Sequence, residues 1–167
     1  LGLGAAAMAI VMGVILGAIA ALKRGRWPDK VIQVVTTALV SMPSFVIATL
    51  LLIIFALNLK WAPTMATQPG GMVLPAISLA LYPMAYITRL ERSAMLDVLG
   101  QDYIRTARAK GVREWAVIFK HALRNALIPV ITYVGPMTAY ILTGSLVVET
   151  VFTIGGLGTK FVTGITN

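Results

Sequence analysis

Four long apolar stretches, separated by short polar segments, make up most of the chain. They cover approximately residues 2–22, 31–59, 72–90 and 126–148, and charged side chains are almost absent from them. A helix needs about 20 apolar residues to cross the hydrocarbon core of a bilayer. The pattern therefore predicts an all-α membrane protein, a polytopic bundle of about four transmembrane helices that forms a single domain over residues 1–167.

Prolines interrupt every stretch except the first. Pro43 lies in the second stretch, Pro75 and Pro83 in the third, and Pro129 and Pro136 in the fourth. A proline removes one backbone hydrogen bond from a spanning helix, which is tolerated where neighbouring helices or hydroxyl side chains satisfy the freed carbonyl. We therefore expect kinked helices that pack against one another.

The first stretch carries Gly13 and Gly17, a pair of small residues four positions apart. Such pairs allow two helices to approach closely. A seam between two subunits would use the pair in this way, and so would packing inside one bundle. We expect packing inside the bundle.

Composition agrees with a membrane protein. Hydrophobic residues make up 58% of the chain and charged residues 12%, whereas soluble domains have about 45–50% and about 25%. Because the chain has no cysteine, it has neither a disulfide framework nor a thiolate metal site. The apolar start has no charged region before it and no cleavage site after it, so we do not expect a signal peptide.

Basic residues are concentrated in alternate connections between the apolar stretches. Of the 14 Lys and Arg residues, four lie in residues 23–30 and eight in residues 89–125, and the other two are Lys60 and Lys160. Because cytoplasmic loops carry such an excess, we expect loops 23–30 and 89–125 to be cytoplasmic and an outer segment, 149–167, to lie on the opposite side. This topology accounts for the net charge of +8, so we expect no nucleic-acid partner.

The chain lacks the common motifs of nucleotide binding and hydrolysis. It contains no G-x-x-x-x-G-K-[ST], no H-E-x-x-H and no G-x-S-x-G, so we expect no enzyme activity, no catalytic residue, no metal site and no cofactor bound by this chain. His121 is the single histidine, and we expect it to be structural. We expect Glu149 to have an interfacial or capping role. No acidic residue is expected in the middle of a spanning helix, which argues against a proton-coupled carrier.

The third connection, residues 91–125, shows helical periodicity. Spacings of three and four residues are typical of an amphipathic helix. One face would carry Asp97, Gln101, Arg105 and Arg108, and the other face Leu96, Leu99, Tyr103 and Ala107. Lys110-Gly111 then predicts a helix end, because glycine suits the left-handed position after a C-cap.

A second amphipathic helix follows the glycine. Its apolar stripe would consist of Trp115, Ile118, Phe119, Ala122 and Leu123. Two interpretations of this helix–turn–helix connection remain open. Basic amphipathic helices lie on anionic membrane surfaces, and the same connection could pack its stripes on the bundle and present the Gly111 turn to a cytoplasmic partner.

The connection also resembles a known family. Gln101–Thr132 has the sequence QDYIRTARAKGVREWAVIFKHALRNALIPVIT, which is similar to the EAA loop of binding-protein-dependent ABC importer permeases in its oligopeptide/dipeptide form. Ser41–Pro63 and Val148–Gly158 are similar to segments of the B-type subunit of these permeases. The resemblance covers nearly the whole chain.

Two positions depart from the family pattern. Arg105-Thr106-Ala107 replace the general Glu-Ala-Ala, as is common in the peptide class, and Gly155-Gly156 stand where the outer segment often has a proline. The B-type subunit has six helices and an additional N-terminal region. The resemblance therefore implies that the first and the last helix lie outside this chain.

The resemblance implies a permease subunit that couples ATPase closure to alternating access. Its partners would be a second homologous permease subunit, cytoplasmic ABC ATPases that bind the ATP, and an extracytoplasmic solute-binding protein, all at a bacterial or archaeal cytoplasmic membrane. The ATPase-coupling residues would be Tyr103, Arg105, Thr106, Ala107, Arg108, Lys110 and Gly111. A secondary transporter or channel that needs no ATPase remains the alternative.

Polar residues within the spanning stretches are candidates for the translocation path. The residues proposed for it are Ser41, Ser44, Thr132, Tyr133, Tyr140 and Thr143. Hydroxyl groups of this kind suit peptide-like solutes, but they would serve equally well to satisfy carbonyls freed by the prolines. The solute itself stays open among dipeptides, oligopeptides, nickel chelates and glutathione.

Overall fold

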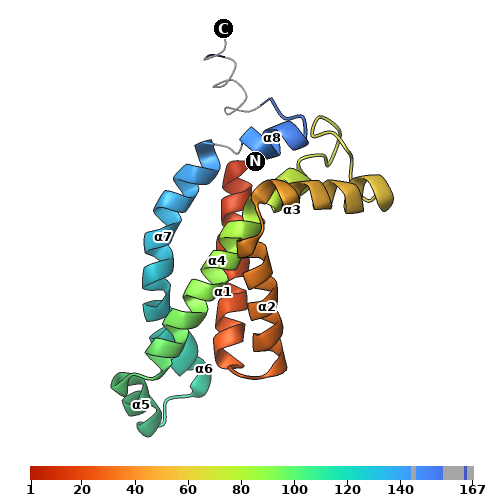
Figure 1. The fold of residues 1–167 in the computed structure, drawn as a ribbon. Coiled ribbons are helices and arrows are strands. Elements are labelled where there is room, and N and C mark those ends of the chain that lie inside the picture. The colour runs from red at the N-terminus through yellow and green to blue at the C-terminus, as the bar shows by residue number, and fades with distance from the viewer. Residues whose placement is uncertain (144–145, 156–163, 165–167) are drawn as a thin grey trace.

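Every regular element in the computed structural model is a helix, among the residues that it describes, namely 1–143, 146–155 and 164. The helices α1 (Gly2–Leu22), α2 (Trp27–Ser41), α4 (Val73–Leu99) and α7 (Arg124–Thr143) form an elongated bundle (Figure 1). Three helices of the described residues are long and apolar enough to cross a membrane, or four if one bent pair forms a single span. The predicted all-α membrane bundle is confirmed.

The centre of the bundle is the contact between α1 and α4, the most extensive between any two described helices. A Cβ atom added to Gly13 would lie 2.7 Å from Ile87, and one added to Gly17 would lie 2.7 Å from both Glu91 Cβ and the Thr88 carbonyl. The absence of a side chain therefore permits this approach, as small residues do in membrane bundles. The pair packs inside the bundle, as expected.

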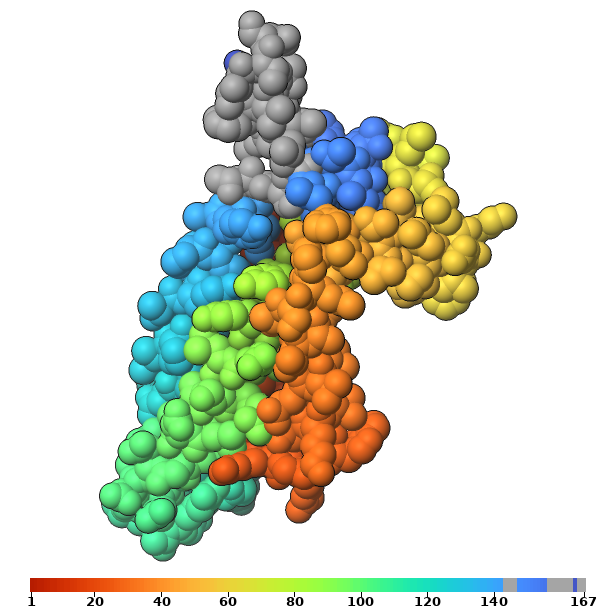
Figure 2. Space-filling model, in the orientation of Figure 1, coloured from red at the N-terminus to blue at the C-terminus, as the bar shows by residue number. Residues whose placement is uncertain are grey.

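The second apolar stretch is not one helix over 31–59, because it bends sharply at a proline. After α2 ends, Met42 is extended, with φ −88° and ψ 134°, since a residue before proline avoids helical geometry. The chain restarts as α3 (Ser44–Leu51) and continues as a π-helix, η1 (Leu52–Asn58). The angle between the two halves is 108°, so α3 and η1 form an arm that projects from the bundle (Figure 2).

The third spanning helix is longer than the expected 72–90. It begins at Val73, contains Pro83 and continues to Leu99, where Gly100 ends it. Residues assigned by their charge to the third connection therefore lie inside α4. Glu91 and Arg92 are the two that matter most, because α4 places both against other helices of the bundle.

The fourth spanning helix differs from the expected 126–148 at both ends. After α5 (Asp102–Ala109), the chain forms α6 (Glu114–Ala116) and the π-helix η2 (Val117–Leu123), and it continues without a break into α7. Beyond α7, α8 (Leu146–Val151) is a separate short helix. Of the outer segment 149–167, only residues 149–155 and 164 belong to the described part of the chain.

The two basic connections lie at one end of the bundle. The turn between α1 and α2 and the helices α5 and α6 are together at the lower end in Figure 1, while the N-terminus, α3 and α8 are at the upper end. Small clusters of buried residues fill each level of the bundle. Ala21, Met95, Ile104, Val117, Ala122 and Ala126 form the cluster that joins α5 and η2 to α1, α4 and α7.

Candidate functional site

The loop at the basic end turns at Gly111, as the sequence predicts. Gly111 has φ +75°, a left-handed conformation. Its N–H donates to the Arg108 carbonyl at 2.9 Å, and the Val112 N–H donates to the Ala107 carbonyl at 3.2 Å. These two bonds are those of a Schellman motif, which closes the C-terminus of a helix. No atom lies within 4 Å of an added Cβ at Gly111, so the backbone conformation requires this glycine, whereas steric space does not.

The helix α5 buries a different face from the one that the sequence pattern predicts. Ile104 is fully buried, whereas Tyr103 is exposed. The expected continuous helix is broken at Gly100-Gln101, and the extended Gln101 begins a new helix. The restart changes the phase, so Leu96 and Leu99 no longer share a face with Tyr103.

Two side-chain contacts brace the loop. The Tyr103 hydroxyl accepts a hydrogen bond of 2.8 Å from Asn125 Nδ2, which connects α5 to the first turn of α7. Across the glycine turn, Arg108 donates to both Glu114 carboxylate oxygens, at 2.7 and 3.2 Å. This exposed pair contributes about 0.2–1 kcal/mol at most, and its effect is to fix the direction of the turn.

The remaining predicted coupling residues divide into outward and inward positions. Arg105, Thr106 and Lys110 are exposed, whereas Ala107 is partly buried against the cluster that joins α5 to the bundle. The Thr106 hydroxyl donates to the carbonyl of Asp102, in its own helix. Six of the seven predicted residues are therefore exposed, and the seventh, Ala107, packs against the bundle.

The helix after the turn buries only part of the predicted apolar stripe. Ala122 is fully buried and Ile118 is partly buried, as predicted. Trp115 and Phe119 are instead each 62% exposed, and Val117, which is not in the stripe, is fully buried. The reason is the π-helical geometry of η2, because the wider turn shifts which positions face the bundle. The exposed aromatic pair therefore adds an apolar element to a basic loop surface.

At the opposite end of the bundle, the bend between α2 and α3 borders a cavity of about 390 Å³. Three of the predicted path residues line it, namely Ser41, Ser44 and Tyr140, together with Tyr82 of α4. Ligand pockets in proteins begin at about 300 Å³. The bend thus brings together side chains from four separate helices around a space large enough for a small solute.

A neighbouring cavity, also of about 390 Å³, shares Tyr82 and Tyr140 with the first and adds Tyr133. Tyr133 stacks on Tyr86, with ring centroids 4.4 Å apart. Thr132 lines neither cavity, and the side chain of Thr143 lies outside the described residues. Tyr82 and Tyr86 were not predicted, because only the fold shows that α4 and α7 present their tyrosines to the same space.

Two hydroxyl groups of the path, those of Ser41 and Thr132, do not satisfy proline-freed carbonyls. Ser41 donates to the Thr37 carbonyl at 2.9 Å, and Thr132 donates to the Ile128 carbonyl at 3.1 Å. Neither carbonyl lies four residues before a proline, so both bonds are ordinary contacts within a helix. A serine bonded in this way keeps its lone pairs available as acceptors.

One acidic side chain, Glu91, lies inside a spanning helix. The sequence predicts none in the middle of such a helix, and Glu91 lies toward the basic end of α4. It belongs to α4, its side chain is 0% exposed, and neither carboxylate oxygen has a hydrogen-bond partner among the described residues. Its Cβ and Cγ atoms lie against Gly17 of α1. Glu91 therefore faces the α1–α4 contact, away from the cavities that the tyrosines line.

Comparison with known proteins gives a consistent result. The family described as "Binding-protein-dependent transport system inner membrane component" matches residues 13–167. The chain is 51% identical over 166 residues to the dipeptide transport system permease protein of Bacillus subtilis (strain 168), a match that covers 99% of this chain and 54% of that protein.

Two further relatives show the same relation. Identity to the oligopeptide transport system permease protein of Salmonella typhimurium is 45% over 171 residues, covering 99% of this chain and 56% of that protein. Identity to the glutathione transport system permease protein of Escherichia coli O1:K1 is 41% over 158 residues, covering 94% of this chain and 52% of that protein. The chain spans about half the length of the curated relatives it matches.

Proposed function

Because this chain belongs to the family of binding-protein-dependent transport system inner membrane components, we propose that it is the membrane-spanning permease subunit of an ATP-driven importer for peptides or related small solutes. The observation that carries this proposal is the family match over residues 13–167, together with 51% identity to a dipeptide permease. The partners of this subunit are a second homologous permease, ABC ATPases and an extracytoplasmic solute-binding protein.

The loop around Gly111 is the part of the chain that contacts the ATPase. Its Schellman turn gives it a defined shape, and Arg108 and Glu114 brace the turn. Arg105 and Lys110 project outward from this braced scaffold. A rigid, outward-pointing loop transmits displacement without absorbing it, which is the property that coupling to ATPase closure requires.

The orientation in the membrane follows from the positions of the charges. The basic connections 23–30 and 89–125 face the cytoplasm by the positive-inside rule, and they lie at one end of the bundle in Figure 1. The cavity at the α2–α3 bend is then on the outer side, where a binding protein delivers its solute. The membrane is the cytoplasmic membrane of a bacterium or archaeon.

The path for the solute passes the two cavities lined by Tyr82 and Tyr140. Tyrosine and serine hydroxyls both donate and accept hydrogen bonds, which suits the amide groups of a peptide irrespective of its sequence. The relatives' names mention dipeptides, oligopeptides and glutathione, and all three solutes are peptides or peptide-like. We assign the solute class as short peptides.

The alternative function, transport driven by an ion gradient, has one candidate group in the structure, the buried Glu91 inside α4. Buried acidic side chains mark ion pathways in many carriers. The position of Glu91 against Gly17, away from both cavities, does not fit that role. The family match favours the ATP-driven importer.

Co-purification tests the role of the loop. In the complete transporter, the double variant Arg105→Glu, Lys110→Glu reverses two outward charges without disturbing buried contacts. We expect it to remain in the membrane and to lose its ATPase subunits on purification. The matched control is Lys60→Glu, an exposed position outside both basic connections. Retention of the ATPases and full transport by the double variant would contradict the assignment.

A further inference from the structure

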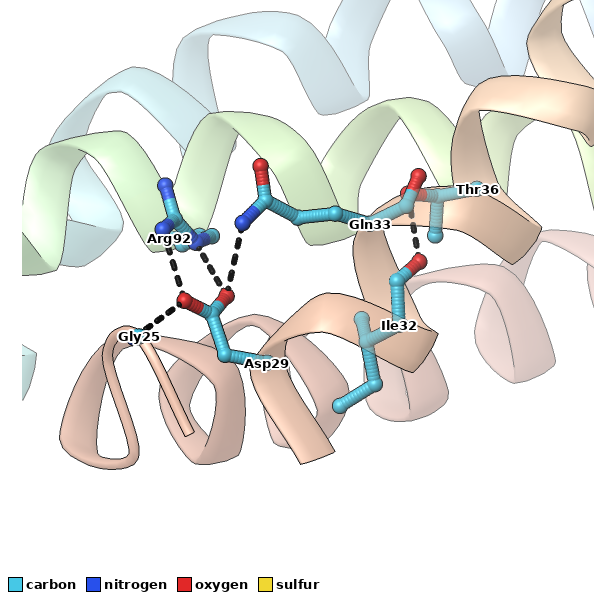
Figure 3. Close-up of polar contacts among 6 residues, drawn as sticks. All are labelled: Gly25, Asp29, Ile32, Gln33, Thr36 and Arg92. Atoms are coloured by element: carbon cyan, nitrogen blue, oxygen red, sulfur yellow. Dashed lines mark hydrogen bonds and ion pairs between the residues drawn. The ribbon is translucent and has the colours of Figure 1, made fainter. Parts of the chain in front are cut away.

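An ion pair between a buried aspartate and a partly exposed arginine joins α2 to α4 near the basic end of the bundle (Figure 3). Arg92 Nε lies 2.7 Å from Asp29 Oδ1, and Arg92 Nη2 lies 2.9 Å from Asp29 Oδ2. Asp29 is 1% exposed. This bidentate geometry is the most specific that an arginine and a carboxylate can form.

The carboxylate of Asp29 accepts two further hydrogen bonds from its own side of the contact. The backbone N–H of Gly25 donates to Oδ2 at 2.8 Å, and Gln33 Nε2 donates to Oδ1 at 3.0 Å (Figure 3). Four donors therefore surround one carboxylate, which fixes its position relative to both α2 and the α1–α2 turn. Higher along the same two helices, Arg89 Nη1 donates to Thr37 Oγ1 at 3.2 Å.

Apolar packing does little to hold α2 in place. Asp29 and Thr36 are its only buried residues. Val34 is 70% exposed, and Val31 and Val35 are exposed as well. The α1–α4 contact, by comparison, is closed along much of its length by small residues. Within the described residues, the polar contacts of Arg89 and Arg92 are therefore the principal specific links between α2 and α4.

The position of the ion pair along α4 gives it a mechanical role. Arg92 lies between Tyr82, which lines both cavities, and Gly100, where α4 passes into the loop. A displacement of the loop reaches α4 directly, because the chain is continuous. It reaches α2, and hence the bend at Pro43, through the ion pair.

We propose that Asp29 and Arg92 are positioning residues that make α2 follow α4, so that movement of the loop changes the cavity at the α2–α3 bend. This inference rests on the proposed function. Buried ion pairs are often no better for stability than apolar residues of similar size, but they specify one geometry. A contact that keeps two helices in one relative orientation while both move requires this single geometry.

The test compares Asp29→Asn and Arg92→Gln with the parent in the complete transporter, reconstituted in proteoliposomes with a dipeptide as solute. Solute uptake and ATP hydrolysis are measured on the same sample. We expect ATP hydrolysis within about twofold of the parent, and uptake per ATP hydrolysed lowered at least fivefold. Lys30→Ala, an exposed neighbour on α2, is the control and is expected to keep the parent ratio.

A cross-link separates a mechanical role from a purely structural one. Residues 1–167 contain no cysteine, so Asp29→Cys, Arg92→Cys introduces a single reactive pair within them. A short bis-methanethiosulfonate linker is expected to restore uptake per ATP at least threefold, and a reducing agent is expected to remove the gain on the same sample. Failure of the linker to restore the ratio, or an unchanged ratio in Asp29→Asn, would overturn the proposal. Absence of ATP-dependent uptake by the parent would instead contradict the proposed function.

Discussion

The two faces of α4 differ in how closely they pack against neighbouring helices. Toward α1, the helix meets Gly13 and Gly17, where even one added carbon would overlap Ile87 or Glu91. Toward α2 and α7, it presents Tyr82 beside two cavities of about 390 Å³ each. The face toward α1, the closed face, packs closely because two glycines lack side chains, whereas the face toward α2 and α7, the open face, borders cavities lined by tyrosines.

The difference shows where movement can occur. Helices that touch along glycines have many short contacts and separate only with a large loss of packing, so we expect α1 and α4 to move as one body. On the open face, polar contacts near the basic end hold α2, whose bend forms one wall of a cavity. We therefore expect α2 to follow α4 through these contacts, and the cavity at the α2–α3 bend to change shape.

The largest effect is expected where the closed face is forced apart. Gly17→Val places a branched side chain where an added Cβ already lies 2.7 Å from the Thr88 carbonyl. Overpacking of this kind costs about 1–3 kcal/mol or more. We expect a marked fall in the yield of monodisperse protein in detergent and a lower melting temperature.

The control for this change is Gly4→Val, because no atom lies within 4 Å of an added Cβ there. It should behave as the parent does in both measurements. Equal tolerance of valine at positions 4 and 17 would break the comparison, since the closed face would then not depend on glycine.

The next effect concerns the loop at the end of α4. Gly111→Ala puts a side chain on a residue with φ +75°, and a left-handed conformation costs an alanine about 1–2 kcal/mol. We expect about a tenfold loss of affinity for the ATPase subunits, measured by titration of the detergent-solubilised permease complex. Gly111→Asn should lose less, because asparagine tolerates this conformation better. Equal affinities for all three proteins would show that the turn is not maintained in the complex.

A smaller effect is expected on the open face. Tyr82→Ala removes the aromatic ring and hydroxyl of a residue that lines both cavities, and the loss of one hydrogen bond alone costs about 0.5–1.5 kcal/mol. We expect the KM for peptide uptake to rise about three- to tenfold, with little change in ATP hydrolysis without solute. Trp61→Ala, an exposed aromatic residue in the connection after η1, is the control. An unchanged KM for Tyr82→Ala would show that the solute does not pass through these cavities.

The smallest effect is expected at Glu91. Glu91→Gln keeps the shape of the side chain that packs on Gly17 and removes its ability to carry a proton. Uptake driven by ATP should stay within about twofold of the parent, because a closed helix contact is not an ion pathway. Loss of uptake in this variant alone would favour a carrier that uses a proton gradient.

Features of this architecture that depend on residues close in sequence could be predicted, whereas those that depend on tertiary contacts could not. The glycine turn at Gly111 and the packing of Gly13 and Gly17 were predicted correctly, since each follows from spacing or backbone preference. The bend at Pro43 was predicted as an interruption, but its angle of 108° depends on tertiary contacts. The π-helix η2 reversed the expected exposure of Trp115 and Phe119, because helical periodicity assumes a regular α-helix.

The ion pair between Asp29 and Arg92 was missed for a different reason. Its residues are 63 positions apart, and no local pattern connects them. The one available signal was Asp29 itself, the single acidic residue among four basic ones in residues 23–30. The loop residues, in contrast, were predicted from a resemblance over Gln101–Thr132, and in the fold all but Ala107 are exposed.

Uptake into proteoliposomes tests the central claim most directly. The full-length protein is reconstituted with its second permease, its ATPases and its binding protein, and labelled dipeptide is added on the binding-protein side. ATP is supplied only on the side of the basic loops. Uptake that requires ATP and stops without the ATPase subunits is the predicted result. Uptake by the permease alone, driven by a proton or sodium gradient, would contradict the account.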